Sequence, residues 1–272
     1  MAVQIRDSAA RKIPLVDELR ELYRFREFLR LLVINSISTR YKRSVLGVFW
    51  TLLNPLLTMT VLTFVFSEIF RSSITHYAVY LLAGIMFWNF FSQTTLFSVS
   101  SLVWGAGLLK RTYVPRSIFV VAALGNGLFN LIVTLLPLVV IMILTGAPFY
   151  PTWWLLPFAI FFLAVFTLGV GLFISALAVE FVDIVDIYQV AIQILFWMTP
   201  IVYPTDALPS SFAWLIKFNP LYHLLKFFRM PIYDGSLPSL EALLAAAGSS
   251  LLVLLAGWAF FGSRANRIVY RI

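Results

Sequence analysis

Hydrophobic residues form long uninterrupted stretches along this chain, and charged residues gather between them. No Asp, Glu, Lys or Arg occurs in residues 72–109 or in residues 117–179. The second stretch is too long for one crossing of a hydrocarbon layer, and its Gly- and Pro-rich part at 146–152 supplies a turn. Because a bilayer core offers no water to unpaired backbone groups, each stretch is predicted to be helical. Six spans are predicted, at about 45–69, 78–103, 117–145, 153–179, 187–203 and 241–262.

Two further segments are not predicted to span the membrane. One is apolar on one helical face only, and the other is too short. Residues 15–33 place six apolar side chains on one helical face, which is typical of an amphipathic helix in the membrane interface. A soluble helix packed on a partner is the alternative. Near the outer surface we expect two short helices at about 207–230, with Asn219 capping the second and Pro220 at its first position. They either dip into the outer leaflet as a re-entrant pair or lie flat on it.

Composition supports an all-α integral membrane protein. Hydrophobic residues make up 61% of the chain and charged residues 12%, a surplus that a water-soluble core of this size could not bury. The organisation expected is a cytoplasmic segment at 1–43, a transmembrane domain at 44–263 and a cytoplasmic tail at 264–272. No cleavable signal peptide is expected, because a charged segment precedes the first apolar run. The chain has no cysteine, which excludes disulfides and thiolate metal sites.

The basic residues behind the net charge of +8 are distributed unevenly between the two sides of the predicted topology. With the N-terminus inside, 16 of the 20 Lys and Arg residues fall on the inner side, in residues 1–43, 104–116 and 263–272. This positive-inside bias predicts that both termini and the 104–116 turn are cytoplasmic. The basic residues are thus explained by a membrane, and no nucleic acid partner is indicated.

No catalytic or metal-binding set is recognisable. His76 and His223 have no cysteine or second histidine at ligand spacing. The sequence GAGLLKRT at 105–112 lacks the glycine that precedes the lysine of a phosphate-binding loop, and it follows an apolar helix. The spans also lack the buried carboxylates expected of an ion-coupled carrier. We therefore expect no ATPase site and no cofactor in this chain, so that any ATP it depends on would be hydrolysed by another polypeptide.

Aromatic residues inside the spans are candidates for lining a path for a sugar chain. Sugar rings stack their C–H faces on aromatic rings, and this contact requires no buried charge. For each residue, packing in the bundle or against lipid is the alternative. The candidates are Phe49, Trp50, Phe87, Trp88, Phe196 and Trp197.

Four motifs identify a family. They are RYKRSVLGVFWTLLNPLL at 40–57, GLLKRTYVPRSI at 107–118, FWMTPIVYP at 196–204 and FNPLYHLLKFFR at 218–229. In this order they resemble the permease subunit of ABC-type polysaccharide exporters of the O-antigen, capsule and wall teichoic acid group. The resemblance covers nearly the whole chain from about residue 20.

The resemblance implies the cellular setting and the partners. The permease would be a homodimer in the bacterial cytoplasmic membrane, served by two copies of a separate nucleotide-binding subunit that holds ATP and Mg²⁺. The cargo would be a glycan on a polyprenyl-pyrophosphate carrier. Arg40, Lys42 and Arg43, at the inner mouth, would attract the pyrophosphate or simply contact lipid headgroups.

The resemblance also assigns site residues. The turn after the second span would be a coupling helix that docks on the ATPase, and its residues are Lys110, Arg111, Tyr113, Pro115 and Arg116. Glu180 and Asp183 either contact the same partner or stabilise the positive end of the fifth span. Relatives commonly carry Arg-Asp-Ile there, whereas this chain has Val at 182. The outer gate would include Pro200, Tyr203, Pro204, Asn219 and Pro220.

Independent physical reasoning supports a rigid elbow at this turn. Pro115 disfavours helix at Val114, and the cations on either side keep the turn in water. Three alternatives to a polysaccharide permease remain open. The chain could be an ABC permease for a drug or small lipid, an ion-coupled carrier or channel, or a membrane enzyme acting on polyprenyl phosphates, although no acid, base or metal set is recognisable for the last.

Overall fold

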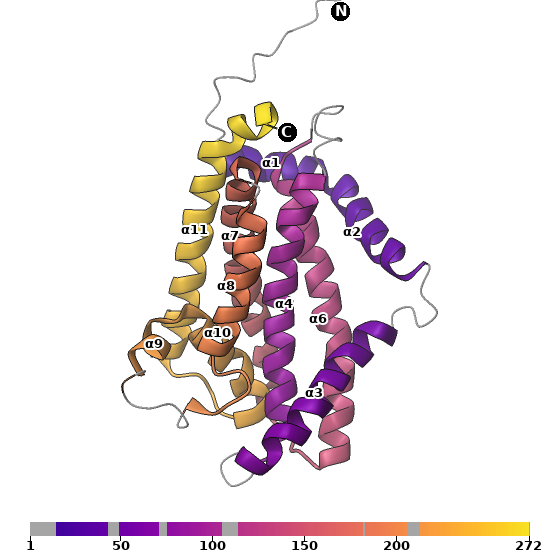
Figure 1. The fold of residues 1–272 in the computed structure, drawn as a ribbon, viewed down its shortest axis with the longest axis vertical. Coiled ribbons are helices and arrows are strands. Elements are labelled where there is room, and N and C mark those ends of the chain that lie inside the picture. The colour runs from indigo at the N-terminus through magenta and orange to yellow at the C-terminus, as the bar shows by residue number, and fades with distance from the viewer. Residues whose placement is uncertain are drawn as a thin grey trace, which may run out of the picture.

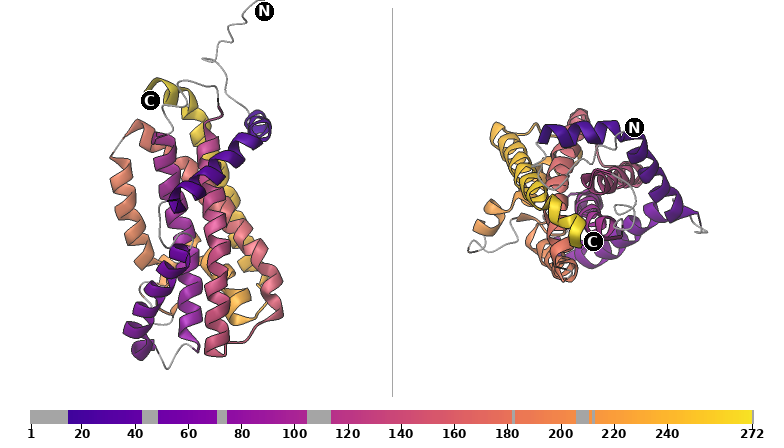
Figure 2. Two further views of the ribbon diagram at one scale, coloured as in Figure 1. Left: turned by 90° about the vertical axis from the view of Figure 1, so that its right-hand side faces the viewer. Right: turned by 90° about the horizontal axis from the view of Figure 1, so that it is seen from above.

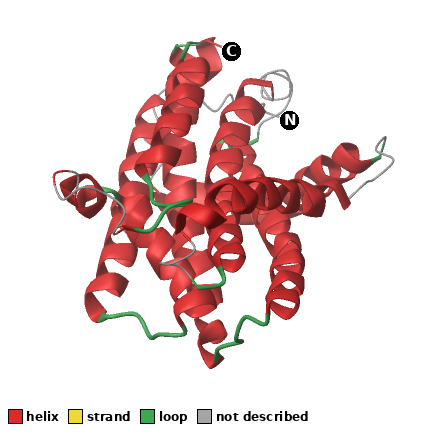
Figure 3. Cartoon of the chain, turned by 60° about the horizontal axis from the view of Figure 1, so that its bottom comes forward, coloured by secondary structure: helices red, strands yellow, loops and turns green. Residues whose placement is uncertain are grey.

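Helices occupy each of the six long apolar stretches in the computed structural model (Figure 3). The structure describes residues 15–42, 49–70, 75–104, 114–181, 183–205, 211 and 213–271. Every regular element in these ranges is helical. Three of the helices are long and apolar enough to cross a membrane, namely Ser117–Thr145, Pro151–Glu180 and Leu240–Arg264.

α4 (Tyr77–Trp104) packs between its antiparallel neighbour α6 (Ser117–Thr145) and the parallel helix α7 (Leu156–Glu180). α6 begins and ends at the predicted residues, and Gly146 ends it in the left-handed conformation, with φ of 66°. The chain then passes through a 3-10 helix (Pro151–Leu155) into α7. α4 contacts both α6 and α7, and most of its residues from Leu81 to Phe91 are buried. α4 is therefore the centre of the bundle.

α11 (Leu240–Arg271) lies against α7 along most of its length. The two backbones approach closely where Gly169 of α7 meets Gly257 of α11, and a Cβ at either position would collide with the backbone of the other helix. Small residues permit this approach, as is usual where helices associate in membranes. The Ser250 hydroxyl adds a hydrogen bond to the Phe162 carbonyl at 2.9 Å.

Two of the other predicted spans differ from simple upright helices. α3 (Phe49–Phe70) runs obliquely across the lower parts of α4 and α6 (Figure 1). α8 (Ile184–Met198) begins three residues before the predicted span and ends five residues before its predicted end at 203. It ends early because Thr199 precedes Pro200 and adopts an extended conformation. At the C-terminus, α11 continues to Arg271, beyond the predicted end at 262.

The two short helices expected before the last span are α9 (Ala213–Phe218) and α10 (Pro220–Arg229). Asn219 caps α10 as predicted, because its side-chain oxygen accepts a hydrogen bond from the Leu221 amide at 3.0 Å. α10 is not a surface helix: it packs on α4, α7 and α11, and Phe228 is fully buried against Phe87. A π turn (Met230–Asp234) then leads toward α11.

The N-terminal amphipathic segment forms two helices instead of one. α1 (Leu15–Arg24) and α2 (Arg26–Tyr41) meet at an angle at Phe25. α1 lies across one end of the bundle, and α2 slopes down from there beside α6 (Figures 1 and 2). The C-terminal end of α11 lies at the same end (Figure 1). The apolar faces of α1 and α2 pack on an inner cluster, which we define as Leu102, Val114, Ile118, Phe119, Val120, Leu172, Ala176, Trp258 and Phe261.

Candidate functional site

A buried arginine holds the chain that follows α8. Arg229, the last residue of α10, is 6% exposed. Its Nη1 donates to the Pro200 carbonyl at 2.8 Å, and its Nη2 donates to the Ile201 carbonyl at 2.5 Å. These carbonyls follow the end of α8, where they have no intrahelical partner. The guanidinium thus satisfies the buried Ile201 carbonyl and supplies the shorter of two hydrogen bonds to the Pro200 carbonyl, which also accepts from the Tyr80 hydroxyl at 3.5 Å.

Two tyrosines of α4 complete this arrangement. The Tyr77 hydroxyl donates to the Val202 carbonyl at 2.8 Å, and the Tyr80 hydroxyl donates to the Tyr203 carbonyl at 3.1 Å. The Arg229 guanidinium also lies over the Tyr80 ring, 3.7 Å from its centroid, in a cation–π contact. We call Tyr77, Tyr80 and Arg229 the outer clamp, because they fix the segment 200–203 to both α4 and α10.

A second tie joins the same segment to the start of α10. The Asn219 amide donates to the Thr199 hydroxyl at 3.0 Å while its oxygen caps the helix. Three predicted gate residues, Pro200, Tyr203 and Asn219, therefore meet at one place. Pro220 begins α10 as its first residue, and Pro204 continues the chain beyond Tyr203. Their role in gating stays a prediction.

The sequence analysis missed Arg229 and the two clamp tyrosines. Arg229 was counted only as one of the cations on the outer side. No local signal identifies it, because a cation in the last turn of a helix is ordinary and Lys226 of the same turn is exposed.

At the opposite end, the described part of the predicted coupling turn adjoins the interface helix α1. Lys110, Arg111 and Tyr113 lie outside the described residues. Val114 is buried in the inner cluster, and Pro115 and Arg116 lead directly into α6, with the Pro115 carbonyl accepting from the Ile118 amide at 3.1 Å. The turn is therefore joined to the bundle core on its α6 side.

Glu18 of α1 is buried beside the first residues of α6 and is only 6% exposed. Burial raises the pKa of its carboxyl, and the charge of Glu21 raises it further. The nearby Ser117 hydroxyl and the Arg116 charge act in the opposite direction. Burial is the largest of these effects, and Glu18 thus places a carboxyl of α1 beside Arg116 and Ser117 at the start of α6.

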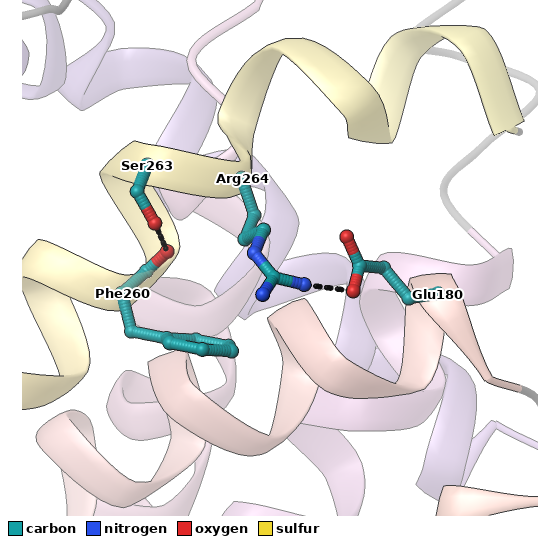
Figure 4. A network of polar contacts seen from close by, with 4 residues as sticks. All are labelled: Glu180, Phe260, Ser263 and Arg264. Atoms are coloured by element: carbon teal, nitrogen blue, oxygen red, sulfur yellow. Dashed lines mark hydrogen bonds and ion pairs between the residues drawn. The ribbon is translucent and has the colours of Figure 1, made fainter.

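Glu180 points into the protein instead of away from it. Its carboxylate pairs with the guanidinium of Arg264 on α11, and the Glu180 side chain is only 5% exposed (Figure 4). Arg264 also lies over the Phe260 ring, 4.8 Å from its centroid. Glu180 therefore joins α7 to α11, whereas Asp183, which precedes α8, is exposed. Whether either residue contacts an ATPase stays a prediction.

The predicted channel aromatics fall into two groups. Phe87 and Trp88 are buried inside the bundle, where Trp88 contacts the ring of Phe196 with a centroid distance of 5.4 Å. Three others are exposed on the surface of the single chain, namely Phe49, Trp50 and Trp197. Their role along a transport path stays a prediction.

The predicted headgroup residues lie around the end of α2. Arg40 is in the last turn of the helix, Lys42 follows it and is exposed, and Arg43 lies outside the described residues. The two described positions are therefore at the end of α2 that lies farther from α1, part of the way down the side of the bundle (Figure 1). Contact with a pyrophosphate stays a prediction.

Comparison with known proteins agrees with the motifs. The chain is 28% identical over 246 residues to an O-antigen export system permease protein RfbA of Klebsiella pneumoniae, covering 90% of this chain and 93% of that protein. It is 29% identical over 249 residues to the protein of the same name from Myxococcus xanthus, covering 90% and 95%. It is 24% identical over 237 residues to the polysialic acid transport protein KpsM of Escherichia coli, covering 86% and 92%. Residues 27–233 match the ABC-2 type transporter family, and the chain belongs to this family.

Proposed function

We propose that the chain is the membrane-spanning subunit of an ATP-driven exporter that moves a lipid-linked polysaccharide outward across the bacterial cytoplasmic membrane. The observation that carries this proposal is the alignment with O-antigen export permeases, which covers 90% of this chain and at least 93% of each of those relatives. The polymer would be of the O-antigen, capsule or teichoic acid type.

The proposed topology has six spans, formed by α3, α4, α6, α7, α8 and α11. The 28 residues of α4 extend about 42 Å, which exceeds the hydrocarbon thickness of a bilayer. The 15 residues of α8 extend only about 22 Å, and the clamped segment 199–203 would complete that crossing. Cytoplasmic termini agree with the Lys and Arg distribution and with α1 and the end of α11 lying together (Figure 1).

ATP would be hydrolysed by two copies of a separate nucleotide-binding subunit beneath a permease homodimer. Their closure would push the turn at 104–116, with Lys110, Arg111, Tyr113, Pro115 and Arg116 in contact with the partner. The inner cluster supports this route, because it packs the end of the turn against α1, α2, α7 and α11. A push at Val114 would therefore reach the interface helices and the last span together.

At the outer end, α9 and α10 would limit leakage while the glycan moves. The outer clamp supports a gate in which α10 and the segment after α8 move as one body, since Arg229 and Asn219 bind both. At the inner mouth, Arg40, Lys42 and Arg43 would meet the pyrophosphate of the carrier lipid.

The test is removal of the gene from its native strain, followed by complementation. We expect surface polysaccharide to disappear and lipid-linked polymer to accumulate inside, and the plasmid-borne chain to restore export. Unchanged surface polysaccharide would refute the proposal. ATPase stimulation by small hydrophobic compounds instead of lipid-linked glycan would favour a drug or lipid exporter, and flux through the purified chain alone would favour a carrier or channel.

A further inference from the structure

The exposed side of α8 carries two different stripes of residues. Successive residues of an α-helix are rotated by about 100°, so the side chains of the first stripe fall within about 80° of the helix circumference. Its members are exposed and mostly polar, namely Asp186, Gln189, Gln193 and Trp197. The adjoining stripe is exposed and apolar, and its members are Ile187, Val190, Ile194 and Met198. We call the first set the polar stripe.

Three of the other long helices, α6, α7 and α11, indicate what this chain presents to lipid; α3 and α4 also expose polar side chains, namely Asn54, Thr58, Thr60 and Gln93. The exposed positions of α6 before Thr145 are all aliphatic, and those of α7 are phenylalanines and one proline. In α11, the exposed positions from Leu243 to Ala259 are Leu, Ala and Gly. None of the exposed side chains in these described stretches can form a hydrogen bond. The polar stripe of α8 therefore does not follow the pattern of a lipid-facing surface.

The cost of desolvating polar side chains also argues against lipid exposure of the polar stripe. Within the part of the chain that the structure describes, the Gln189 and Gln193 amides make no hydrogen bond to another residue. Placing an unpaired amide in hydrocarbon costs roughly 2–7 kcal/mol. Polar side chains inside membrane spans usually face a water-filled cavity or a polar partner. The two glutamines should therefore face water or a hydrogen-bonding ligand.

The chemistry of the polar stripe suits a neutral polyhydroxylated ligand. Each glutamine amide both donates and accepts hydrogen bonds and carries no charge. It can therefore exchange hydrogen bonds with successive hydroxyl groups without binding any one of them tightly. Gln189, Gln193 and Trp197 succeed one another at about 6 Å along the helix axis, close to the repeat of a sugar chain. The exposed Trp197 ring is held edge-on by Phe196, with a centroid distance of 5.2 Å, and offers a flat face for stacking.

We propose that Gln189, Gln193 and Trp197 form a track that binds successive sugar rings of the exported polysaccharide. This inference rests on the proposed function, since it names the residues of this chain that would contact the glycan. The glutamines would hold sugar hydroxyls as each ring passes, and Trp197 would stack on a ring near the outer end. The wide spacing of weak, uncharged contacts lets the polymer advance in steps.

The first test asks whether the polar stripe faces water. The chain has no cysteine, so Gln189→Cys and Gln193→Cys can be labelled in membranes with a charged methanethiosulfonate reagent without background. Leu136→Cys, on the exposed aliphatic side of α6, is the matched control. We expect labelling at both glutamine positions and none at position 136. Either of two results would overturn the proposal: no labelling at 189 and 193, or complete disulfide cross-linking between two copies at these positions instead of labelling.

The second test asks whether the amides serve transport. In a strain lacking the native gene, we expect Gln189→Leu with Gln193→Leu to reach normal membrane levels but to lower surface polysaccharide about tenfold. The pair Val190→Leu with Ile194→Leu, on the apolar stripe, should export normally, and Gln→Asn at both polar positions should retain partial export. Normal export from the double leucine variant would refute the track. If deletion of the gene leaves surface polysaccharide intact, the proposed function fails, while the labelling still reports whether α8 faces water.

Discussion

The guanidinium of Arg229 lies 3.7 Å from the centroid of the Tyr80 ring, and both side chains donate hydrogen bonds to the same short segment after α8. The contact joins α4 at the centre of the bundle to the short helix α10. Arg229 is buried, and a Cβ on Gly84 would collide with its guanidinium. The end of the bundle that holds α10 is thus arranged around the buried Arg229.

Replacing Arg229 with Met should loosen the outer end. The substitution leaves the buried Ile201 carbonyl without its guanidinium donor and the Pro200 carbonyl with only the long hydrogen bond from the Tyr80 hydroxyl, at a cost of about 3 kcal/mol. We expect a lower thermal unfolding midpoint in detergent and loss of export. Tyr80→Phe keeps the cation–π contact and removes the hydrogen bond to the Tyr203 carbonyl and the longer one to the Pro200 carbonyl, so it should cost only about 1 kcal/mol.

Lys217→Gln is the control for Arg229, because Lys217 is an exposed cation on α9. It should leave the unfolding midpoint and export unchanged. An Arg229→Met protein as stable as the parent would contradict the clamp.

The crossing of α7 and α11 should tolerate no added side chain. Gly257→Ala brings a Cβ against the Gly169 carbonyl and should destabilise the protein by about 1–3 kcal/mol. Gly248→Ala, on the same helix, meets no atom within 4 Å and should change stability by less than about 1 kcal/mol. Differential scanning fluorimetry of the two variants measures this contrast, and equal midpoints would show that the helices are further apart.

The ion pair between Glu180 and Arg264 should appear as energetic coupling. Either single change, Glu180→Gln or Arg264→Gln, leaves the partner's charge poorly solvated, because the Glu180 side chain is 5% exposed. The double variant should therefore be less destabilised than the sum of the singles, with a coupling of about 1–3 kcal/mol. Additive effects in this double-mutant cycle would place the two side chains apart.

Glu18 should make stability depend on pH. Burial raises the pKa of its carboxyl in the folded state above that in the unfolded chain, so the folded protein binds the proton more tightly. Its contribution is then fully present below the unfolded pKa and is lost as pH rises through the folded pKa. Unfolding midpoints measured upward from pH 4 should fall across this window in the parent protein and fall less in Glu18→Gln. Identical pH profiles would show that Glu18 is not buried against α6.

Sequence patterns predicted the long helices because an apolar stretch with few charges can satisfy its backbone hydrogen bonds in lipid only as a helix. The bounds of α6, the Asn219 cap and the Pro-rich turn after Gly146 follow from local rules. The same rules could not predict that Arg229 turns inward to the carbonyls after α8, because its partners lie 28 and 29 residues away in the sequence. Nor could they predict that Glu180 pairs with Arg264, since a carboxylate near a helix end serves a partner protein or an internal cation equally well.

The single amphipathic helix expected at 15–33 is broken at Phe25 for a related reason. Periodicity alone continues through this position. The inner cluster, however, takes up apolar side chains from both α1 and α2, and the bend between the helices brings both faces onto it. Tertiary packing thus decides the break, and packing is not encoded in the local pattern.

Vesicle reconstitution tests the proposed export most directly. The purified chain would be placed in inverted vesicles with its nucleotide-binding partner and the lipid-linked polysaccharide of the native strain. We expect polymer to become enclosed in the lumen only when ATP and the partner are both present. Enclosure without the partner, or none when both are present with active ATPase, would contradict export driven by a separate subunit.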